Sequence, residues 1–251
     1  MKKVVLLGGG NVAYHLAQRL TENPQYQLVQ LYNRSPLSTA FDAIAVEKTT
    51  QLEALLPADI YILSVKDDAI AALSKQLPFE GRLVVHTSGS VPMQALSARQ
   101  RRGVFYPLQS FSIAQAVDFS KVPFCLETEE VADYALLEGL AKVFSPKCYA
   151  IDSLQRQYLH VAAVFLNNFT NHLWYLSQQL CTREGIPFEL LQPLLEETYL
   201  KGQQLCFFEG QTGPAKRGDR AVIEKHLALL QGIEKDIYRD ISTSILTTYG
   251  K

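Results

Sequence analysis

The spacing of apolar residues changes along the chain and divides it into two parts. Up to about residue 152, short apolar runs of strand length alternate with segments that have a helical period. After Asp152 only helical periods continue, as far as Tyr249, with breaks at residues 185–187 and 210–214. The expected strands lie at residues 4–7, 27–32, 43–47, 59–65, 83–86, 103–111, 122–126 and 147–151. The third of these has the weakest pattern, and the sixth leaves into a loop within its range.

Helices are expected between most of these strands, including a short one at residues 52–56 and a longer one at residues 129–144. Strands separated by helices form parallel sheets, so the fold expected for residues 1–152 is an α/β domain with a Rossmann-type, mostly parallel sheet. Residues 153–251 are expected to form an all-α C-terminal domain. The sequence has no flexible linker between them, so we expect the two domains to pack directly.

A glycine turn directly follows the first expected strand. Gly8, Gly10 and Ala13 have the G-x-G-x-x-A spacing of dinucleotide-binding folds. Gly8 allows a sharp turn, Gly10 allows the backbone to approach a pyrophosphate, and Ala13 keeps the next helix close to the sheet. An ordinary tight turn is the alternative, but the strand before it and the helix after it favour a dinucleotide site. The residues expected to hold the pyrophosphate are Gly8, Gly9, Gly10, Asn11 and Val12.

The end of the second expected strand indicates which dinucleotide binds. Enzymes that use NAD commonly place Asp or Glu here to bind the ribose 2′-hydroxyl group. This chain has Asn33, Arg34 and Ser35 instead. A guanidinium group can bind a 2′-phosphate through two hydrogen bonds, whereas a carboxylate would repel it. We therefore predict NADP as the cofactor. The alternative is a solvated turn, which these residue types also favour.

Polar residues follow the expected strands at residues 59–65 and 83–86. The carboxyl ends of parallel strands lie at one edge of a sheet, where ligands bind in open α/β folds. Each residue here could serve only in a turn or a helix cap, but together they favour contact with the cofactor or the substrate. The residues at these ends are Ser64, Val65, Lys66, His86, Thr87, Ser88 and Gly89.

The first helix of the C-terminal part, expected at residues 154–183, carries polar residues on an otherwise apolar surface. His160, Asn167 and Asn171 fall near one line of the helix, and Asn168 lies further round. Such groups need hydrogen-bond partners, which could be backbone groups, another subunit or a ligand at the cofactor edge. His160 and Asn168 are therefore candidate site residues.

The same helix has more apolar surface than one small domain can cover, since about 30 residues at about 1.5 Å per residue span about 45 Å. We therefore expect a homodimer formed through the C-terminal helices. The expected contacts are Leu173, Trp174 and Leu176.

A loop between two expected helices, residues 212–219, combines glycines, a proline and two cations. This composition is typical of a shaped loop that holds an anion. Arg217 is expected to bind a substrate carboxylate or phosphate, and Asp219 is a further candidate site residue. The alternative is a solvated loop in which Asp219 only caps the helix expected at residues 220–231.

Composition and charge limit the possible partners. The 24 basic and 25 acidic side chains give a formal net charge of -1, so neither a nucleic acid nor a membrane surface is expected as a partner. The 4 cysteines include no C-x-x-C pair, and we expect neither a metal site nor a disulfide framework. Apolar stretches are too short for a membrane span or a signal peptide, which favours a cytoplasmic location.

Several motifs together resemble those of a known family: HTSG at residues 86–89, YPLQSF at 106–111, the helix at 160–172 and GPAKRGD at 213–219. The glycine turn is similar to that of Rossmann-like oxidoreductases such as pyrroline-5-carboxylate reductase, deazaflavin-dependent NADP oxidoreductase and the 6-phosphogluconate dehydrogenase superfamily. Over nearly its whole length, the chain resembles a bacterial family in which such a domain precedes a helical domain of unknown function 2520. The resemblance implies NADP binding and a helical domain that dimerises.

Together these features predict an NADP-dependent oxidoreductase that transfers a hydride between the nicotinamide and a small carbonyl or imine compound. His160 is the expected proton donor, because histidine can exchange a proton near neutral pH, and Lys66 is the competing acid. Asn168 is expected to orient the substrate carbonyl or the carboxamide of the cofactor. The alternative is a non-catalytic sensor or regulatory protein that binds NADP without turning it over.

Overall fold

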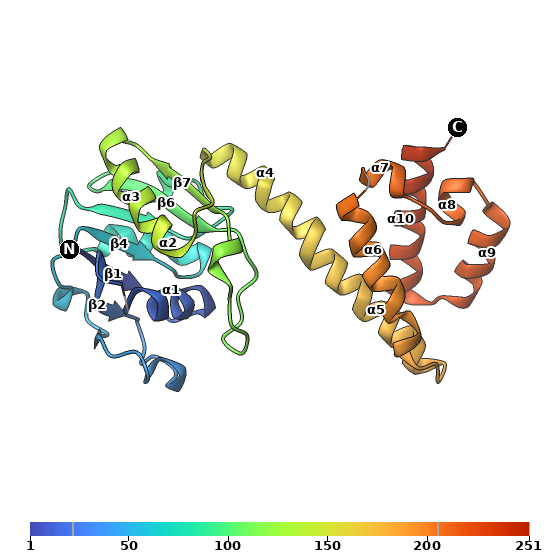
Figure 1. Ribbon diagram of the computed structural model, residues 1–251, viewed down its shortest axis with the longest axis horizontal. Helices are drawn as coiled ribbons and strands as arrows, with labels where there is room; N and C mark the ends of the chain where they lie inside the picture. The colour runs from blue at the N-terminus through green and yellow to red at the C-terminus, as the bar shows by residue number, and fades with distance from the viewer. Residues whose placement is uncertain (22, 205, 251) are drawn as a thin grey trace. The chain divides into compact units, whose positions relative to one another are not determined.

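The computed structural model describes residues 1–21, 23–204 and 206–250 (Figure 1). Contacts between residues divide the chain into two compact units, Met1–Val164 and Phe165–Lys251. The first unit contains a β-sheet and the second is built from helices. An α/β fold followed by an all-α region is thereby confirmed.

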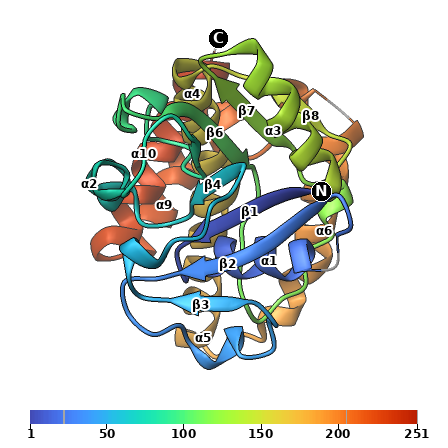
Figure 2. The same cartoon turned by 90° about the vertical axis from the view of Figure 1, so that its left-hand side faces the viewer.

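The described residues of the first unit form one sheet of eight strands: β1 (Lys2–Leu7), β2 (Tyr26–Tyr32), β3 (Glu47–Thr49), β4 (Ile60–Leu63), β5 (Leu83–His86), β6 (Arg101–Pro107), β7 (Phe124–Thr128) and β8 (Cys148–Ala150). Their order is β3-β2-β1-β4-β5-β6-β7-β8, and Figure 2 shows the first part of this series side by side. Neighbouring strands are parallel except β6 and β7, which are antiparallel. The sheet is therefore mostly parallel, as predicted.

Helices cover both faces of the sheet: α1 (Asn11–Thr21), α2 (Asp67–Gln76) and α3 (Val131–Phe144). Val4 and Leu6 of β1 lie in one apolar cluster with residues of α1 and α3. Val5 and Leu7 lie in a second cluster with residues of α2. Successive side chains of a strand point to opposite faces, so a strand buried on both sides reads as a continuous apolar run. This explains why β1 could be recognised from the sequence.

Two short elements differ from the sequence prediction. The third strand begins only at Glu47 instead of spanning residues 43–47, and residues 52–56 contain a single 3-10 turn, η2 (Leu52–Ala54), rather than a helix. The fully buried side chain of Gln30 accounts for both differences. Its Nε2 donates to Glu47 Oε1 at 2.7 Å and to the last carbonyl oxygen of η2 at 2.9 Å. A buried amide needs such partners, and these two contacts fix where the segment can pair.

The helix expected at residues 154–183 is present but contains a π-helical turn. Three segments follow one another: α4 (Ser153–Ala163), η5 (Val164–Phe169) and α5 (Thr170–Arg183). The start of α4 packs on the sheet, where Arg156 forms an ion pair with Glu127 of β7. Residues 153–164 therefore group with the first unit.

Every described element of the second unit is helical: after α5 come η6 (Phe188–Leu191), α6 (Gln192–Gln204), α7 (Phe207–Gly210), α8 (Pro214–Arg217), α9 (Arg220–Leu229) and α10 (Gly232–Tyr249). Ala215, Ile223 and Leu227 form a small buried core, against which Tyr238 and Ile245 of α10 pack. Among the described residues, no helix is both long enough and apolar enough to cross a membrane.

Candidate functional site

A cleft of about 1090 Å³ lies at the carboxyl ends of the central strands of the first unit. It runs across the ends of β2, β1, β4, β5 and β6, which includes the point where the strand order reverses. Ligands of open α/β sheets bind at this point, and ligand pockets commonly measure about 300–1,000 Å³. The cleft therefore has room for an extended ligand such as a dinucleotide. The predicted site residues that line it are Gly9, Gly10, Asn11, Val12, Asn33, Arg34, Ser64, Val65, Lys66, Thr87, Ser88, Gly89 and His160.

The glycine turn between β1 and α1 has the backbone that a bound pyrophosphate requires. Gly8 has a φ of 134°, and a Cβ there would overlap the carbonyl oxygen of Ser64, so only glycine fits. A Cβ at Gly10 would meet nothing within 4 Å, which leaves open space in front of the first turn of α1. Amide groups at a helix start bind anions. The turn therefore fits the pyrophosphate of a dinucleotide.

The turn after β2 presents an arginine and no carboxylate. Arg34 is exposed and lines the cleft, and the described residues give its side chain no hydrogen bond or ion pair. Asn33 Nδ2 donates to the carbonyl oxygen of Ser35 at 2.8 Å, which holds the turn together. A guanidinium group in this setting is suited to an anionic partner.

The segment after β6 runs along the start of α1. Asn11 Nδ2 donates to the carbonyl oxygen of Phe111 at 2.9 Å, and His15 Nε2 lies 2.9 Å from the carbonyl oxygen of Ser112. Gln109 and Phe111 line the cleft. The motif that contains them contributed to the family resemblance, but its role as one side of the cleft was not predicted.

The side chains at the ends of β4 and β5 are hydrogen bonded within the site. Thr87 Oγ1 donates to Ser64 Oγ at 3.3 Å, and both residues line the cleft. Ser88 is buried, and its hydroxyl oxygen accepts from the amide groups of Ser90 and Val91 at 3.1 and 3.0 Å. Ser88 thus shapes the loop after β5 and also lines the cleft. A turn residue at this position can therefore also lie beside a bound ligand.

Two acidic residues that were not among the predicted site residues, Asp67 and Asp68, also line the cleft. Asp67 is the first residue of α2, and its carboxylate accepts a hydrogen bond from Ser90 Oγ. Lys66, directly before it, is exposed at the cleft. The segment after β4 therefore presents one cation and two carboxylates at consecutive positions, since Asp68 lines the cleft as well.

His86, the last residue of β5, is completely buried. Its Nδ1 accepts from the amide group of Ser88 at 3.2 Å, so the neutral ring carries its proton on Nε2. Burial, followed by the charge of Arg156, lowers the pKa of His86 to about 4. The ring is therefore neutral near pH 7 and shapes the loop, and it is not suited to proton exchange in the cleft.

A tyrosine and a histidine meet at the part of the cleft formed by β6 and α4. Tyr106 Oη and His160 Nδ1 are 3.2 Å apart. Gly89 lies against both rings, since a Cβ there would be 2.6 Å from His160 Nδ1 and 2.8 Å from Tyr106 Cζ. Burial raises the pKa of Tyr106 to about 12, so its hydroxyl group keeps its proton. His160 was predicted as a site residue, whereas the role of Tyr106 was missed.

Three predicted site residues belong to the second unit. Asn168 lies in η5 and is exposed. Arg217 is the last residue of α8 and is also exposed. Asp219 caps α9, because its Oδ1 accepts from the amide group of Val222 at 3.2 Å, and this is the alternative role that the sequence allowed. A role of these three residues in a ligand site stays a prediction.

The fold and the cleft define a Rossmann-type, dinucleotide-binding class of protein. Residues 3–89 match the family described as NADP oxidoreductase coenzyme F420-dependent, and residues 122–245 match the domain of unknown function DUF2520. BF3122 from Bacteroides fragilis, provisionally named an NADP oxidoreductase, is 38% identical over 97% of each chain, with a TM-score of 0.86. The chain therefore belongs to the family of NADP oxidoreductases that carry DUF2520, and the resemblance stated from its motifs is confirmed.

More distant solved structures share the fold. Protein TM1727 from Thermotoga maritima is 20% identical, with 98% of each chain covered and a TM-score of 0.73. A reductive aminase from Aspergillus terreus, in complex with NADPH and ethyl levulinate, is 14% identical, with 100% of this chain and 95% of that chain covered and a TM-score of 0.74. Similarity at this level of identity shows the fold alone. Among curated proteins, no match was found.

Proposed function

We propose that the protein is an NADP-dependent oxidoreductase that transfers a hydride between the nicotinamide ring and a small carbonyl or imine compound. The Tyr106–His160 pair carries this proposal, because it adds a group that can exchange a proton to a cleft that otherwise fits a dinucleotide. The family match and the reductive-aminase fold support the same reaction class.

The cofactor would be held by residues along the cleft. Arg34, with Asn33 and Ser35 in the same turn, would bind the 2′-phosphate, and the amide groups of the glycine turn would bind the pyrophosphate. Residues 64–66 and 87–89 would contact the other half of the dinucleotide, because their strands lie on the side of β1 opposite to β2. When bound, the nicotinamide supplies or accepts the hydride.

His160 would exchange the proton that accompanies this reduction. Its Nδ1 is hydrogen bonded to Tyr106, so Nε2 is the nitrogen left to give a proton to the substrate oxygen or nitrogen, or to take one. Tyr106 can donate to Nδ1 of the neutral ring and can accept from Nδ1 of the charged ring. The ring therefore keeps one orientation in both protonation states. Lys66 is the competing acid.

Three residues of the second unit stay predicted substrate contacts in this proposal. Asn168 would orient the substrate carbonyl or the cofactor carboxamide, and Arg217 would bind a substrate carboxylate or phosphate. Asp219 would act through the cap it forms on α9, two residues after Arg217 at the end of α8. The proposal includes a homodimer formed through the helices of the second unit.

Cofactor binding is tested by calorimetry with NADPH on two glycine variants. A Cβ at Gly10 or at Gly210 would meet nothing within 4 Å, and neither glycine has a positive φ, so the fold tolerates alanine at both positions. Gly10→Ala should weaken NADPH binding at least about tenfold, because the methyl group fills space that the pyrophosphate needs. Gly210→Ala should bind NADPH as the wild type does. Wild-type affinity in Gly10→Ala would place the cofactor elsewhere.

Turnover is tested by supplying the wild-type protein and NADPH with aldehydes, ketones and cyclic imines. Reduction of at least one compound, with a strong dependence on His160, supports the oxidoreductase. Tight NADPH binding without turnover of any compound favours a sensor or regulatory protein. Absence of NADPH binding overturns both.

A further inference from the structure

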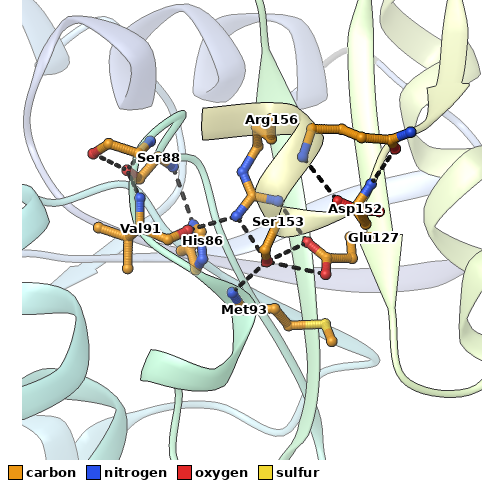
Figure 3. Close-up of polar contacts among 10 residues, drawn as sticks. His86, Ser88, Val91, Met93, Glu127, Asp152, Ser153 and Arg156 are labelled. Carbon is orange, nitrogen blue, oxygen red and sulfur yellow. Dashed lines mark hydrogen bonds and ion pairs between the residues drawn. The ribbon is translucent and has the colours of Figure 1, made fainter. Parts of the chain in front are cut away.

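A largely buried ion pair joins β7 to α4 one helical turn before His160. Arg156 is fully buried, and its Nη1 donates to Glu127 Oε2 on β7 at 2.5 Å (Figure 3). Its Nη2 donates to the carbonyl oxygen of Val91 at 2.5 Å, in the loop after β5. Residues four apart lie on the same side of a helix, so His160 and Arg156 share one side of α4.

Ser153 extends this network into the first turn of α4. Its hydroxyl donates to Glu127 Oε2 at 2.8 Å and accepts from the amide group of Met93 at 2.9 Å (Figure 3). We call Glu127, Ser153 and Arg156 the α4 clamp. The clamp binds the backbone of the loop after β5 at two positions, Val91 and Met93, and joins that loop to α4 and β7.

The clamped loop also contains Gly89, against which Tyr106 and His160 pack. The beginning of this loop is held by His86, whose Nδ1 accepts from the amide group of Ser88 (Figure 3). A Cβ at Gly89 would already be closer to His160 than a normal contact, so the loop and α4 have little room to shift relative to each other. The position of the clamp therefore decides how the His160 ring meets Tyr106.

A gain in folding stability does not explain why the α4 clamp contains the charged residues Glu127 and Arg156. Replacing a buried ion pair by apolar residues of similar size is often neutral or stabilising, because the pair no longer has to be desolvated. None of the three clamp residues is among the described residues that line the cleft. Directional hydrogen bonds, however, fix the register of α4 on the loop, whereas apolar contacts would tolerate a small rotation or slide.

We propose that the α4 clamp is a positioning device that sets the orientation of His160 for proton exchange in the cleft. This inference rests on the proposed function of His160. Misplacing a reacting group by about 1 Å can cost about a hundredfold in rate, so a clamp outside the cleft can control turnover without contacting the substrate.

The test compares two double variants that each replace an ion pair by apolar residues. Glu127→Leu with Arg156→Met removes the clamp charges. Arg101→Met with Asp133→Leu is the matched control, since that pair, at 2.5 Å, also joins a strand of the sheet to a helix and lies outside the cleft. The clamp variant should lose at least about tenfold in kcat, with KM and the Kd for NADPH within about threefold of wild type. The control should keep the wild-type kcat within about twofold.

Nuclear magnetic resonance of the His160 Cε1–H group gives a second readout that needs no substrate. This resonance, assigned with His160→Asn, should shift in the clamp variant in the same direction as in Tyr106→Phe, and it should stay in place in the control. If the wild type turns over no compound, the proposed function fails while the clamp is still judged by this shift. A folded clamp variant with the wild-type resonance and kcat would overturn the proposal.

A milder variant covers the case in which the double variant does not fold. Ser153→Ala removes the contacts to Glu127 and Met93 but leaves the ion pair in place. It should lower kcat at least about twofold at unchanged KM and shift the His160 resonance. Arg156→Lys can keep the contact to Glu127 but not the one to Val91 as well. Its loss of kcat should therefore lie between the losses of Ser153→Ala and of the double variant. Wild-type kcat and resonance in Ser153→Ala would also overturn the proposal.

Discussion

Tyr106 Oη lies 3.2 Å from His160 Nδ1, and the two rings meet edge to face with an interplanar angle of 73°. The tyrosine lies near the end of β6 and the histidine is in α4, so the contact joins two elements of the first unit. A ring nitrogen that is hydrogen bonded to a tyrosine is not available to a ligand. Proton exchange in the cleft therefore depends on His160 Nε2, and the orientation of Nε2 depends on Tyr106.

Removing the histidine should affect turnover and spare the cofactor. His160→Ala is expected to lower kcat by more than about tenfold and to leave the Kd for NADPH within about threefold, because it deletes the proton donor but no phosphate contact. Tyr106→Phe keeps the ring and should cause a smaller loss, about threefold to tenfold, since the histidine remains but is less well oriented. Steady-state kinetics and calorimetry measure both values.

Wild-type turnover in His160→Ala would contradict this assignment. In that case Lys66, which is exposed at the cleft, becomes the candidate proton donor, and Lys66→Met should then abolish turnover. Loss of NADPH binding in His160→Ala to the degree seen in Gly10→Ala would also contradict it, because His160 would then be a cofactor residue.

Arg34 should decide the choice of cofactor. With a guanidinium group and no carboxylate in the turn after β2, the wild type should bind NADPH at least about tenfold more tightly than NADH, a difference of about 1.4 kcal/mol. Arg34→Asp should reverse this order, because the carboxylate repels the 2′-phosphate and can accept from the 2′-hydroxyl group. Arg19→Asp on the exposed side of α1 is the control and should leave the preference unchanged. Equal binding of both cofactors by the wild type, measured by calorimetry, rules the assignment out.

The parts of the site that could be predicted from the sequence depend on residues that are close to one another along the chain. Gly8 is required by a backbone conformation at one position, and the apolar run before it forms a strand buried on both faces. Once the strands alternate with helices, the parallel sheet brings their carboxyl ends to one edge. The sequence therefore predicts that Ser64 and Thr87 lie close together, and their hydroxyl groups are hydrogen bonded.

The parts that could not be predicted depend on contacts between distant segments. Tyr106 reads as one more aromatic residue of a strand, and only the packing of α4 brings it to His160. Gln30 interrupts an apolar strand, but its partners after β2 decide where the next strand begins. The π-helical turn η5 likewise leaves no mark in the apolar period of the helix that contains it. The spacing of apolar residues indicates which side chains are buried, but it does not indicate which distant residues contact each other.

The helices of the second unit should form a homodimer. Trp174 is 47% exposed and Leu173 is 37% exposed in the single chain, and such large apolar side chains commonly lie in interfaces. Light scattering at micromolar concentration should give about twice the chain mass of 28.1 kDa, and Trp174→Glu should shift it toward the mass of one chain. Val131→Glu, which changes an exposed residue of the first unit, should stay dimeric. A wild-type mass of one chain would contradict the dimer.

His86 should make the stability of the protein depend on pH. Burial and the nearby charge of Arg156 lower its pKa from 6.5 to about 4, and the Pro92 backbone and Asp67 oppose this shift only partly. Between these two pH values the unfolded chain binds a proton that the folded chain does not. The free energy of unfolding should therefore fall as the pH is lowered from 6.5 to about 4, by about 3 kcal/mol from this group, and the contribution is fully present above pH 6.5.

The contribution of His86 can be isolated by comparing the wild type with His86→Asn in denaturant titrations at several pH values. Asparagine cannot titrate, and its side-chain oxygen can still accept a hydrogen bond from the loop, so the variant should be less stable than the wild type at pH 7. The gap between the two proteins should narrow by about 3 kcal/mol as the pH falls to about 4, since only the wild type gains a proton at this position when it unfolds. Carboxylates titrate in both proteins and cancel in the difference. Parallel curves over this range would show that His86 is protonated in the folded state at the same pH as in the unfolded chain, and that burial does not hold its ring neutral.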